Sequence, residues 1–308
     1  MVARERFELS SAGPKPAMLT PHSLNWIKDK VDFLKYLQSK HYNENYAKSI
    51  LSYLSRHVGI IREPMDIIRI CSNLSNGQQH NLNRALSALI KFFEIKGYDM
   101  DFLNSLRKAI PRDNIGVDLK IPSEQEISNS IRKLSRAPIK YQALYNLLLD
   151  SGLRLTEAVR AINEFKKAEK VKGFYRVTLG YFRASKIAYA AYFTERTFNL
   201  IKNVEEKIME CGARRYYSKY DFVTTKYIRK FAFDTMISLD IPESIADFIQ
   251  GRTPKKIGAK HYMALLRQAD NFYGKYAGYL HRLRGREEIH KATVQARVQF
   301  ISTSLNLG

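Results

Sequence analysis

The sequence predicts a mainly helical protein of two domains, the second of which is α+β because it holds one small β-hairpin. Apolar residues recur at helical intervals over most of the 308 residues, and this length accommodates two domains. Residues 174–194 break the pattern, because β-branched and aromatic side chains flank a polar RASK there. Residues 111–122 hold two prolines and one glycine without periodicity, so we expect an extended linker.

The first domain is expected to be a basic helical bundle over residues 21–110, preceded by a polar tail over residues 1–20. Proline suits the first position of a helix, so Pro64 is expected to open a short one. Apolar spacing places the other four helices of this domain at 23–38, 43–58, 82–95 and 100–109. Gly97 is expected to end the helix at 82–95.

The second domain is expected to cover residues 123–283. Ser123 and Glu126 form an S-x-x-E capping box, which is typical of a helix start. Residues 284–308 begin with charges and end in STSLNLG, which fits either a mobile tail or a docking helix. Besides the hairpin, the expected elements are helices at 123–135, 138–150, 154–163, 195–210, 224–239, 242–250 and 259–283.

The charge balance points to a polyanionic partner. Lys and Arg number 51 against 30 Asp and Glu, which gives a net charge of +21 and a pI near 9.8. Such an excess suits nucleic acid or an anionic membrane surface. The chain has no apolar run long enough to span a bilayer, and its first residues lack the apolar core of a signal peptide. Cys71 and Cys211 form no C-x-x-C pair, which fits a reducing compartment.

The sequence predicts no metal site and no cofactor. A metal-dependent nuclease would need clustered carboxylates, and none are apparent. His261 stands beside Tyr262 and is the one histidine near a candidate site, although a plain surface role is the simpler interpretation. None of the histidines shows the spacing of metal ligands: His22, His41, His57, His80, His261, His281 and His290.

Several cations stand at element boundaries, and at a helix start the positive end of the helix dipole disfavours a further positive charge. Lys226 and Arg229 lie three residues apart, so they share one face at the start of a predicted helix, where the macrodipole is already positive. Arg154 likewise follows a glycine at a helix start, and Arg252 follows Gly251 directly. A solvated basic face is the plain interpretation. Alternatively, the arginines converge on one phosphate, which their planar fork geometry suits.

Five pieces in order resemble the tyrosine recombinase (phage-type integrase) superfamily over about residues 123–270. SGLRLTE at 151–157 is similar to the first-arginine box, with Arg154 as that arginine. KYIR at 226–229 occupies the usual H-x-x-R box, and GRT at 251–253 occupies the usual glycine-histidine box. Tyr262 falls at the spacing of the nucleophile. Lys226 and Arg252 stand at the two positions where the superfamily usually has histidine. This departure makes the chain similar to the integrases of archaeal spindle viruses and plasmids.

The resemblance implies a division of roles among these residues. Tyr262 would attack a DNA phosphodiester, and the three arginines would stabilise the charge that develops on its oxygens. The hairpin should carry a lysine as general acid; Lys186 is the only lysine in it, and Arg183 is the alternative. Lys226 would orient a phosphate oxygen or assist the tyrosine. Glu157 would position the arginine or lysine side chains, or have a purely structural role.

The implied function is site-specific DNA recombination through a 3′-phosphotyrosine, with integration of a viral or plasmid element into a host chromosome. The expected partners are double-stranded attachment-site DNA and other copies of the chain, which would assemble as a tetramer on that DNA. The expected location is the cytoplasm of a prokaryotic host, bound to DNA. Two other interpretations stay open: a non-catalytic basic DNA-binding protein and a type IB topoisomerase-like enzyme. Three tyrosines compete with Tyr262 for the nucleophile role, although their helical spacing is also typical of packing: Tyr273, Tyr276 and Tyr279.

Overall fold

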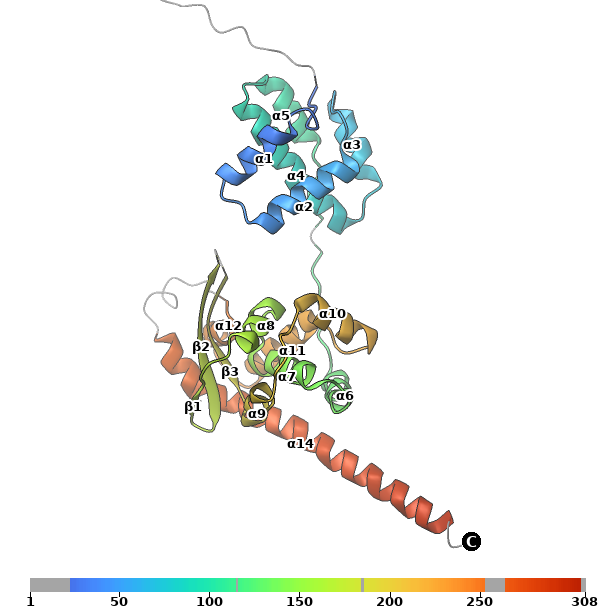
Figure 1. Cartoon of the computed structure of the whole chain (residues 1–308), viewed down its shortest axis with the longest axis vertical. Coiled ribbons are helices and arrows are strands. Elements are labelled where there is room, and N and C mark those ends of the chain that lie inside the picture. The colour runs from blue at the N-terminus through green and yellow to red at the C-terminus, as the bar shows by residue number, and fades with distance from the viewer. Residues whose placement is uncertain (1–22, 115, 184–185, 253–263, 306–308) are drawn as a thin grey trace, which may run out of the picture. The chain divides into compact units, whose positions relative to one another are not determined.

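The computed structural model describes residues 23–114, 116–183, 186–252 and 264–305. The chain divides into two compact units, Met1–Asp118 and Leu119–Gly308. Both units are mainly helical, and the second also contains a small antiparallel sheet, as the sequence predicts (Figure 1). In the part of the chain that is described, no helix is both long and apolar enough to cross a membrane.

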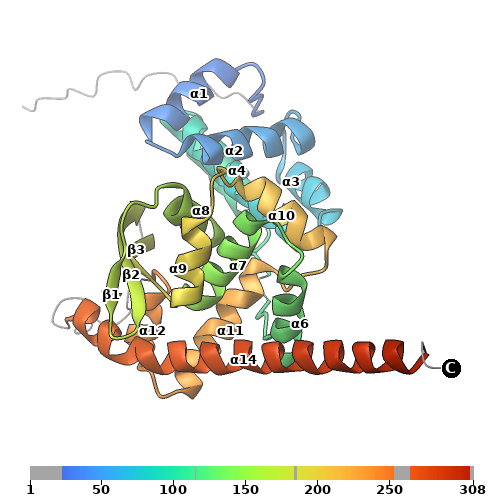
Figure 2. The ribbon, with the colours of Figure 1, turned by 60° about the horizontal axis from the view of Figure 1, so that its bottom comes forward.

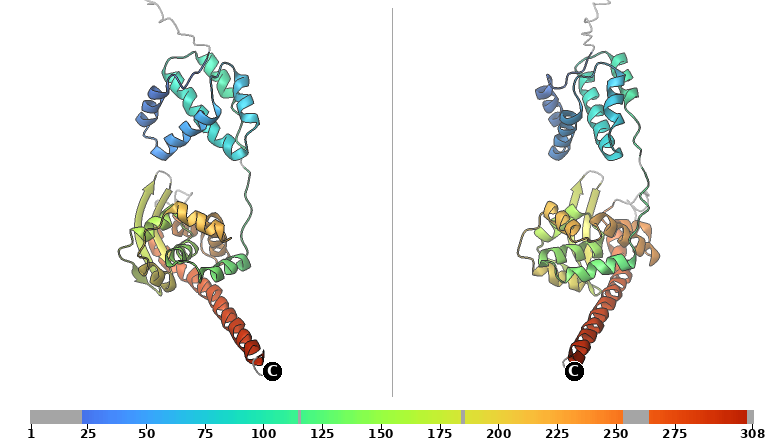
Figure 3. Two further views of the ribbon diagram at one scale, coloured as in Figure 1. Left: turned by 45° about the vertical axis from the view of Figure 1, so that its right-hand side comes forward. Right: turned by 90° about the vertical axis from the view of Figure 1, so that its right-hand side faces the viewer.

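The first unit packs its helices around one long central helix, α4. Within its core Leu82, Leu86, Leu89 and Phe93 of α4 are fully buried, at the helical spacing that the sequence shows. Figure 3 gives two further views of this bundle, in blue to teal. Its helices are α1 (Lys30–Ser39), α2 (Glu44–His57), α3 (Pro64–Ser72), α4 (Asn76–Ile95) and α5 (Met100–Ala109).

The first expected helix begins later than predicted, because Ser23–Asp29 is not helical. Leu24 instead pairs with Ile61 through two backbone hydrogen bonds, of 2.7 and 3.0 Å. The Trp26 indole donates to the carbonyl of Val58 at 2.8 Å. Leu24 lies in an isolated bridge and residues 26–29 form a turn, so Leu24 and Trp26 are buried whereas Ile27 is 60 % exposed. The expected helix over 23–38 therefore begins only at Lys30.

The linker is fixed to α4 at its first residues. Asn83 donates to the Pro111 carbonyl and to the Asp113 carboxylate, both at 2.8 Å. His80 lies 2.6 Å from the other oxygen of Asp113. These contacts hold the pKa of Asp113 below its usual value, chiefly through the hydrogen bond from His80. Beyond this point Val117 and Leu119 are more than 80 % exposed, as an extended linker requires.

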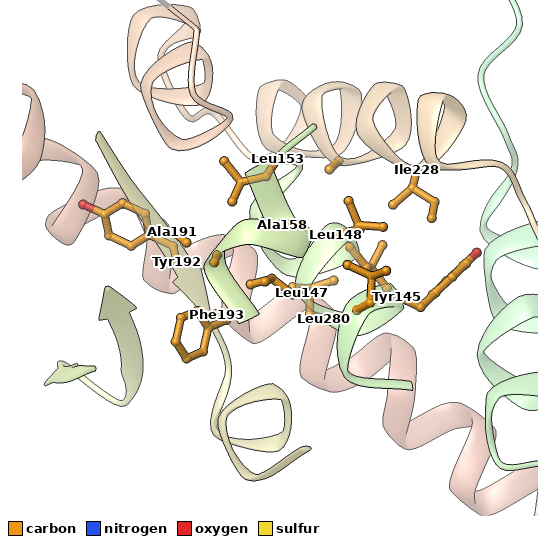
Figure 4. Packing of buried hydrophobic residues seen from close by; sticks show 14 of the residues in the cluster. Tyr145, Leu147, Leu148, Leu153, Ala158, Ala191, Tyr192, Phe193, Ile228 and Leu280 are labelled. Carbon is orange, nitrogen blue, oxygen red and sulfur yellow. The ribbon is translucent and has the colours of Figure 1, made fainter. Parts of the chain in front are cut away.

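The other elements of the second unit pack around one buried helix, α7. Every residue of α7 from Ala143 to Ser151 is buried. Figure 4 shows its side chains in contact with residues from several other elements, including Ile228 and Leu280. The helices are α6 (Glu124–Leu134), α7 (Ile139–Ser151), α8 (Leu155–Asn163), α9 (Glu195–Lys202), α10 (Glu210–Lys219), α11 (Thr225–Ser238), α12 (Glu243–Ile249) and α14 (Leu265–Leu305).

The predicted hairpin is confirmed and belongs to a three-stranded antiparallel sheet of order β1-β2-β3. The strands β2 (Phe174–Arg183) and β3 (Lys186–Phe193) pair along their length, with an irregularity between Thr178 and Tyr181. The third strand, β1 (Glu169–Val171), is too short to show alternation in the sequence. The buried face of β3 packs on α7, which places the hairpin against the centre of the unit (Figures 1 and 4).

Two helix boundaries in this unit differ from the prediction. The helix expected over 195–210 ends at Lys202, and a separate helix, α10, begins at Glu210. This short helix was missed because its apolar stripe is minimal: only Ala213 and Tyr217 are buried. The helix expected over 259–283 continues as α14 to Leu305, drawn in red in Figures 2 and 3.

Candidate active site

Arg154 lies at the start of α8, just after the tight turn that connects α7 to α8. Gly152 ends α7 with a left-handed φ of +59°, and its amide donates to the carbonyl of Leu148 at 2.9 Å. A Cβ at Gly152 would come within 2.4 Å of the Gln250 side chain. Glycine is therefore needed both for the conformation and for the approach of α12. Only Leu153 separates this turn from Arg154, which begins α8.

Glu157 holds the half-buried Arg154 in place. One Glu157 carboxylate oxygen accepts from the Arg154 Nη1 at 2.6 Å, and the other accepts from the Arg154 backbone amide at 3.0 Å. The same Nη1 donates to the carbonyl of Gly251 at 2.8 Å. The carboxylate therefore closes the first turn of α8 and fixes the guanidinium at the same time.

Arg229 ties the ends of two helices together from the first turns of α11. Its Nη1 donates to the carbonyls of Gly152 and Gln250, both at 2.7 Å. The Gln250 side chain returns a hydrogen bond to the Arg229 carbonyl at 2.9 Å. The second terminal nitrogen, Nη2, is buried and has no hydrogen-bond acceptor within the described residues. A buried guanidinium donor without a partner is costly and is suited to receive an anion.

Arg252 completes the cluster from the end of α12. Its backbone amide donates to the carbonyl of Asp247 at 2.8 Å, and its Nη1 lies 3.4 Å from the Asp247 carboxylate. Its guanidinium lies over the Phe233 ring, 4.9 Å from the centroid. Gly251 directly before it has a left-handed φ of +67°. A Cβ there would lie 2.9 Å from the Cβ of Ala188 on β3.

The three arginines form one electropositive cluster. The pKa of Arg229 is lowered to about 9, first by desolvation and then by the neighbouring charges of Arg154 and Arg252, against the opposing effect of Glu157 and Asp247. This pKa is still well above neutrality, so the guanidinium remains charged near pH 7. Its charge is held at an energetic cost that a bound anion would relieve.

The structure describes the other predicted site residues to different extents. Lys226 lies one turn before Arg229 on α11, with an exposed side chain whose Nζ is 5.4 Å from the Tyr227 ring centroid. Arg183 and Lys186 pair in register at the end of the hairpin where β2 connects to β3, and their side chains are outside the described set. Tyr262 also lies outside the described residues, as does His261.

Two of the tyrosines that compete with Tyr262 for the nucleophile role are excluded by their burial. Tyr273 and Tyr276 are fully buried, and desolvation raises the pKa of both phenols well above the usual value. A DNA phosphate cannot reach them, so packing is the correct interpretation. Tyr279 is partly buried, and its hydroxyl donates to Glu124 at 2.7 Å.

Two residues of the cluster were not predicted from the sequence. Gln250 is fully buried and bonds the Arg229 main chain, but nothing distinguishes it from a surface glutamine at a helix end. Asp247 is 5 % exposed and faces Arg252 across the end of α12. Their five-residue separation is not a spacing at which helical side chains meet, so the pair depends on the turn at Gly251.

The close approach at Gly251 predicts a specific cost. Gly251→Ala should lower the free energy of unfolding by about 2–4 kcal/mol, from left-handed strain plus overpacking against Ala188. Gly173→Ala is the matched control, because its φ is +90° but a Cβ there meets nothing within 4 Å. Urea unfolding of both variants checks this, and equal losses would show that the contact with β3 contributes nothing.

The described residues hold no group of three His, Cys, Asp or Glu side chains that could bind a metal ion. Within that part of the chain the side chains of the cluster are guanidinium groups, carboxylates and the Gln250 amide. Such a set of donors suits a phosphate with charged oxygens.

Comparisons with known proteins bear on the family and the fold. The family described as archaeal phage integrase matches residues 119–279, more than half of the chain. A lambda integrase tetramer bound to a Holliday junction has a similar structure, with a TM-score of 0.59 at 13 % identity, covering 81 % of this chain and 84 % of that one. A lambda integrase(75-356) dimer bound to a COC' core site gives a TM-score of 0.57 at 12 % identity, covering 75 % and 96 %. No curated protein matches the sequence.

Proposed function

Because the chain belongs to the archaeal phage integrase family, and is thus a tyrosine recombinase of the integrase type, we propose that it cuts and rejoins DNA through a 3′-phosphotyrosine. One observation carries the proposal most directly. Arg154, Arg229 and Arg252 converge from three helix ends on one place, where a buried donor of Arg229 has no acceptor among the described residues. An arrangement of this kind stabilises charge that develops on a phosphate.

In the proposed reaction the Tyr262 hydroxyl loses its proton to solvent as its oxygen attacks the scissile phosphorus, and the bond from phosphorus to the 5′ oxygen breaks. The arginines hydrogen-bond the non-bridging oxygens of the five-coordinate transition state, where negative charge is greatest. The departing 5′ oxygen takes a proton from Lys186, or from Arg183 if that residue has the role instead. Attack of a 5′-hydroxyl on the phosphotyrosine reverses these steps, so ligation needs no external energy source.

The remaining residues would support the arginines. Glu157 holds Arg154 through two hydrogen bonds, which favours the positioning role over a purely structural one. Lys226 projects from the helix that carries Arg229 and would reach a phosphate oxygen or Tyr262. No metal and no cofactor takes part in this scheme.

The proposed partners are double-stranded attachment sites and other copies of the chain. Structures of lambda integrase, which has the same fold, hold a DNA core site or a Holliday junction, the latter with a tetramer. The net charge of +21 supports a DNA partner. By this reasoning the protein would act in a prokaryotic cell, integrating a viral or plasmid element into the chromosome.

The decisive experiment uses suicide duplexes that carry a nick close to candidate cleavage sites. After cleavage the short fragment diffuses away, so religation fails and the covalent protein–DNA adduct accumulates on a denaturing gel. An adduct resistant to denaturant supports the proposal. A protein that binds DNA tightly and never forms the adduct on any such duplex would be a non-catalytic DNA-binding protein. Relaxation of supercoiled plasmid without strand exchange would indicate the topoisomerase-like alternative.

DNA binding is expected to weaken steeply with salt. If about six to ten phosphates are neutralised, affinity should fall roughly 10³–10⁵-fold between 50 and 200 mM salt. The reason is that each contacted phosphate releases its condensed counterions. Fluorescence anisotropy with labelled duplex measures this slope. A flat profile would contradict an electrostatic interface formed by this basic chain.

A further inference from the structure

The end of the central helix α7 is capped by tyrosine hydroxyls from α14. Tyr276 donates to the carbonyl of Leu149 at 2.8 Å, and Tyr273 donates to the carbonyl of Asp150 at 3.1 Å. The last carbonyls of a helix have no partner within that helix. Both tyrosines are fully buried, so water does not replace these donors. Their phenol pKa values are raised by burial, which keeps the hydroxyls protonated as donors.

A buried ion pair fixes the same junction from a later turn of α14. Arg284 pairs with the Asp150 carboxylate, and both side chains are at least 96 % buried. The other Asp150 oxygen accepts from the amide and hydroxyl of Thr194, each at 2.8 Å, and from Thr197 at 2.7 Å. The side chain of Asp150 therefore joins α14 to the residue that follows β3. In this buried network both Asp150 oxygens accept hydrogen bonds, while the Arg284 Nε has no acceptor among the described residues, and the shared carboxylate favours a single arrangement of these elements.

The capped carbonyls lie very close in the chain to the arginine cluster. Arg154 follows Asp150 by four positions, and the turn between them is fixed by Gly152. The carbonyl of Gly152 itself accepts from Arg229. Three carbonyls at this helix end are thus held from outside the helix, those of Leu149 and Asp150 by α14 and that of Gly152 by a cluster arginine. A shift of the α7 end would move both guanidinium groups.

We propose that Tyr273 and Tyr276 are positioning residues for Arg154 in DNA cleavage, acting through the α7 carbonyls that they cap. The inference rests on the proposed function, because DNA cleavage is its readout. Tyr262 precedes the first residue of α14 by three positions in the sequence. α14 would therefore position Arg154 through the tyrosine caps, and in the sequence it directly follows the segment that carries the proposed nucleophile.

The test measures single-turnover cleavage of a suicide duplex by Tyr273→Phe, Tyr276→Phe and the double variant. Loss of the caps should lower the cleavage rate about 10–100-fold, since a displacement near 1 Å can cost about 100-fold, while DNA affinity stays unchanged. Tyr279→Phe is the matched control: it removes a hydroxyl from the same helix whose partner is Glu124 rather than α7. That control should cleave at the wild-type rate.

The same changes are then made in an Arg154→Lys background, which separates positioning from loss of structure. If the tyrosines act through Arg154, their removal should cost less than about threefold there, because coupled residues are not additive. An equal loss in both backgrounds would overturn the proposal, as would cleavage by the double variant at the Tyr279→Phe rate. Thermal unfolding sets an assay temperature at which each variant is folded. If the double variant does not fold, the two single variants decide on the same criteria. Absence of cleavage by the wild-type protein would instead refute the proposed function.

Discussion

Replacing Tyr262 by phenylalanine is expected to abolish covalent attachment to DNA and to leave DNA affinity unchanged. The phenolic oxygen is the only atom removed, and it would form the bond to phosphorus. Removal of a nucleophile typically costs on the order of 10⁴-fold or more in rate, so adduct should fall below detection. Suicide duplexes and a denaturing gel measure the adduct, and anisotropy measures the affinity.

Tyr279→Phe serves as control here too, because it removes a hydroxyl from α14 without affecting the arginine cluster. Adduct that persists in Tyr262→Phe would show that another residue is the nucleophile. Mass spectrometry of the protease-digested adduct would then identify that residue directly. The buried Tyr273 and Tyr276 would not be the candidates, since DNA cannot approach them.

Arg229→Gln is expected to lower the cleavage rate about 10²–10³-fold, equivalent to roughly 3–4 kcal/mol of transition-state stabilisation. Arg229 donates to two carbonyls through Nη1, and its buried Nη2 has no acceptor among the described residues. A glutamine side chain cannot reproduce this arrangement of donors. Lys230→Gln is the matched control, because it removes the same charge from the next position of α11. Its ammonium bonds the carbonyl of Lys120 and lies 5.4 Å from the Tyr227 ring centroid.

Single-turnover cleavage and DNA affinity of the two variants separate the two explanations of the basic cluster. A purely electrostatic role predicts equal, modest losses of both quantities in both variants. A catalytic role predicts a large rate loss in Arg229→Gln alone. Sulfate provides a second readout: it should raise the unfolding midpoint of the wild type more than that of Arg229→Gln, because the anion relieves the cost of the desolvated charge.

Sequence reasoning singled out Arg154 and Arg252 because each lies close to a glycine that ends a helix, and such ends have strong local signals. Arg154 follows a glycine that stops α7, and Arg252 follows a second one. What sequence reasoning could not supply was the set of tertiary partners. Asp247 and Gln250 join the site through a turn in the main chain, and the tyrosine caps join it through a helix that crosses beneath α7. No periodicity encodes contacts of that kind.

The boundary errors have a similar cause. The expected helix over 23–38 counted Ile27 and Val31 as buried, but both are exposed, and the residues before α1 that reach the core, Leu24 and Trp26, lie in a bridge and a turn. α10 was overlooked because a short helix that buries only two side chains has almost no amphipathic signal. Two long helices were predicted within a few residues, apart from the first turns of α4: α4, which has a periodic apolar stripe, and α7, which is apolar on nearly every side.

The contact between Gly251 and Ala188 also limits how sequences of this type can diverge. Neither residue has a side chain capable of chemistry, yet the space between them admits no additional carbon atom. Substitutions at these two positions should therefore be rare and correlated, with a larger residue at one tolerated only if the strand withdraws. In an alignment of relatives, the pair would stand out as two small residues that vary less than the exposed residues on either side. Evolutionary constraint would then extend beyond the groups that touch DNA, to the places where the backbone needs room to bring those groups together.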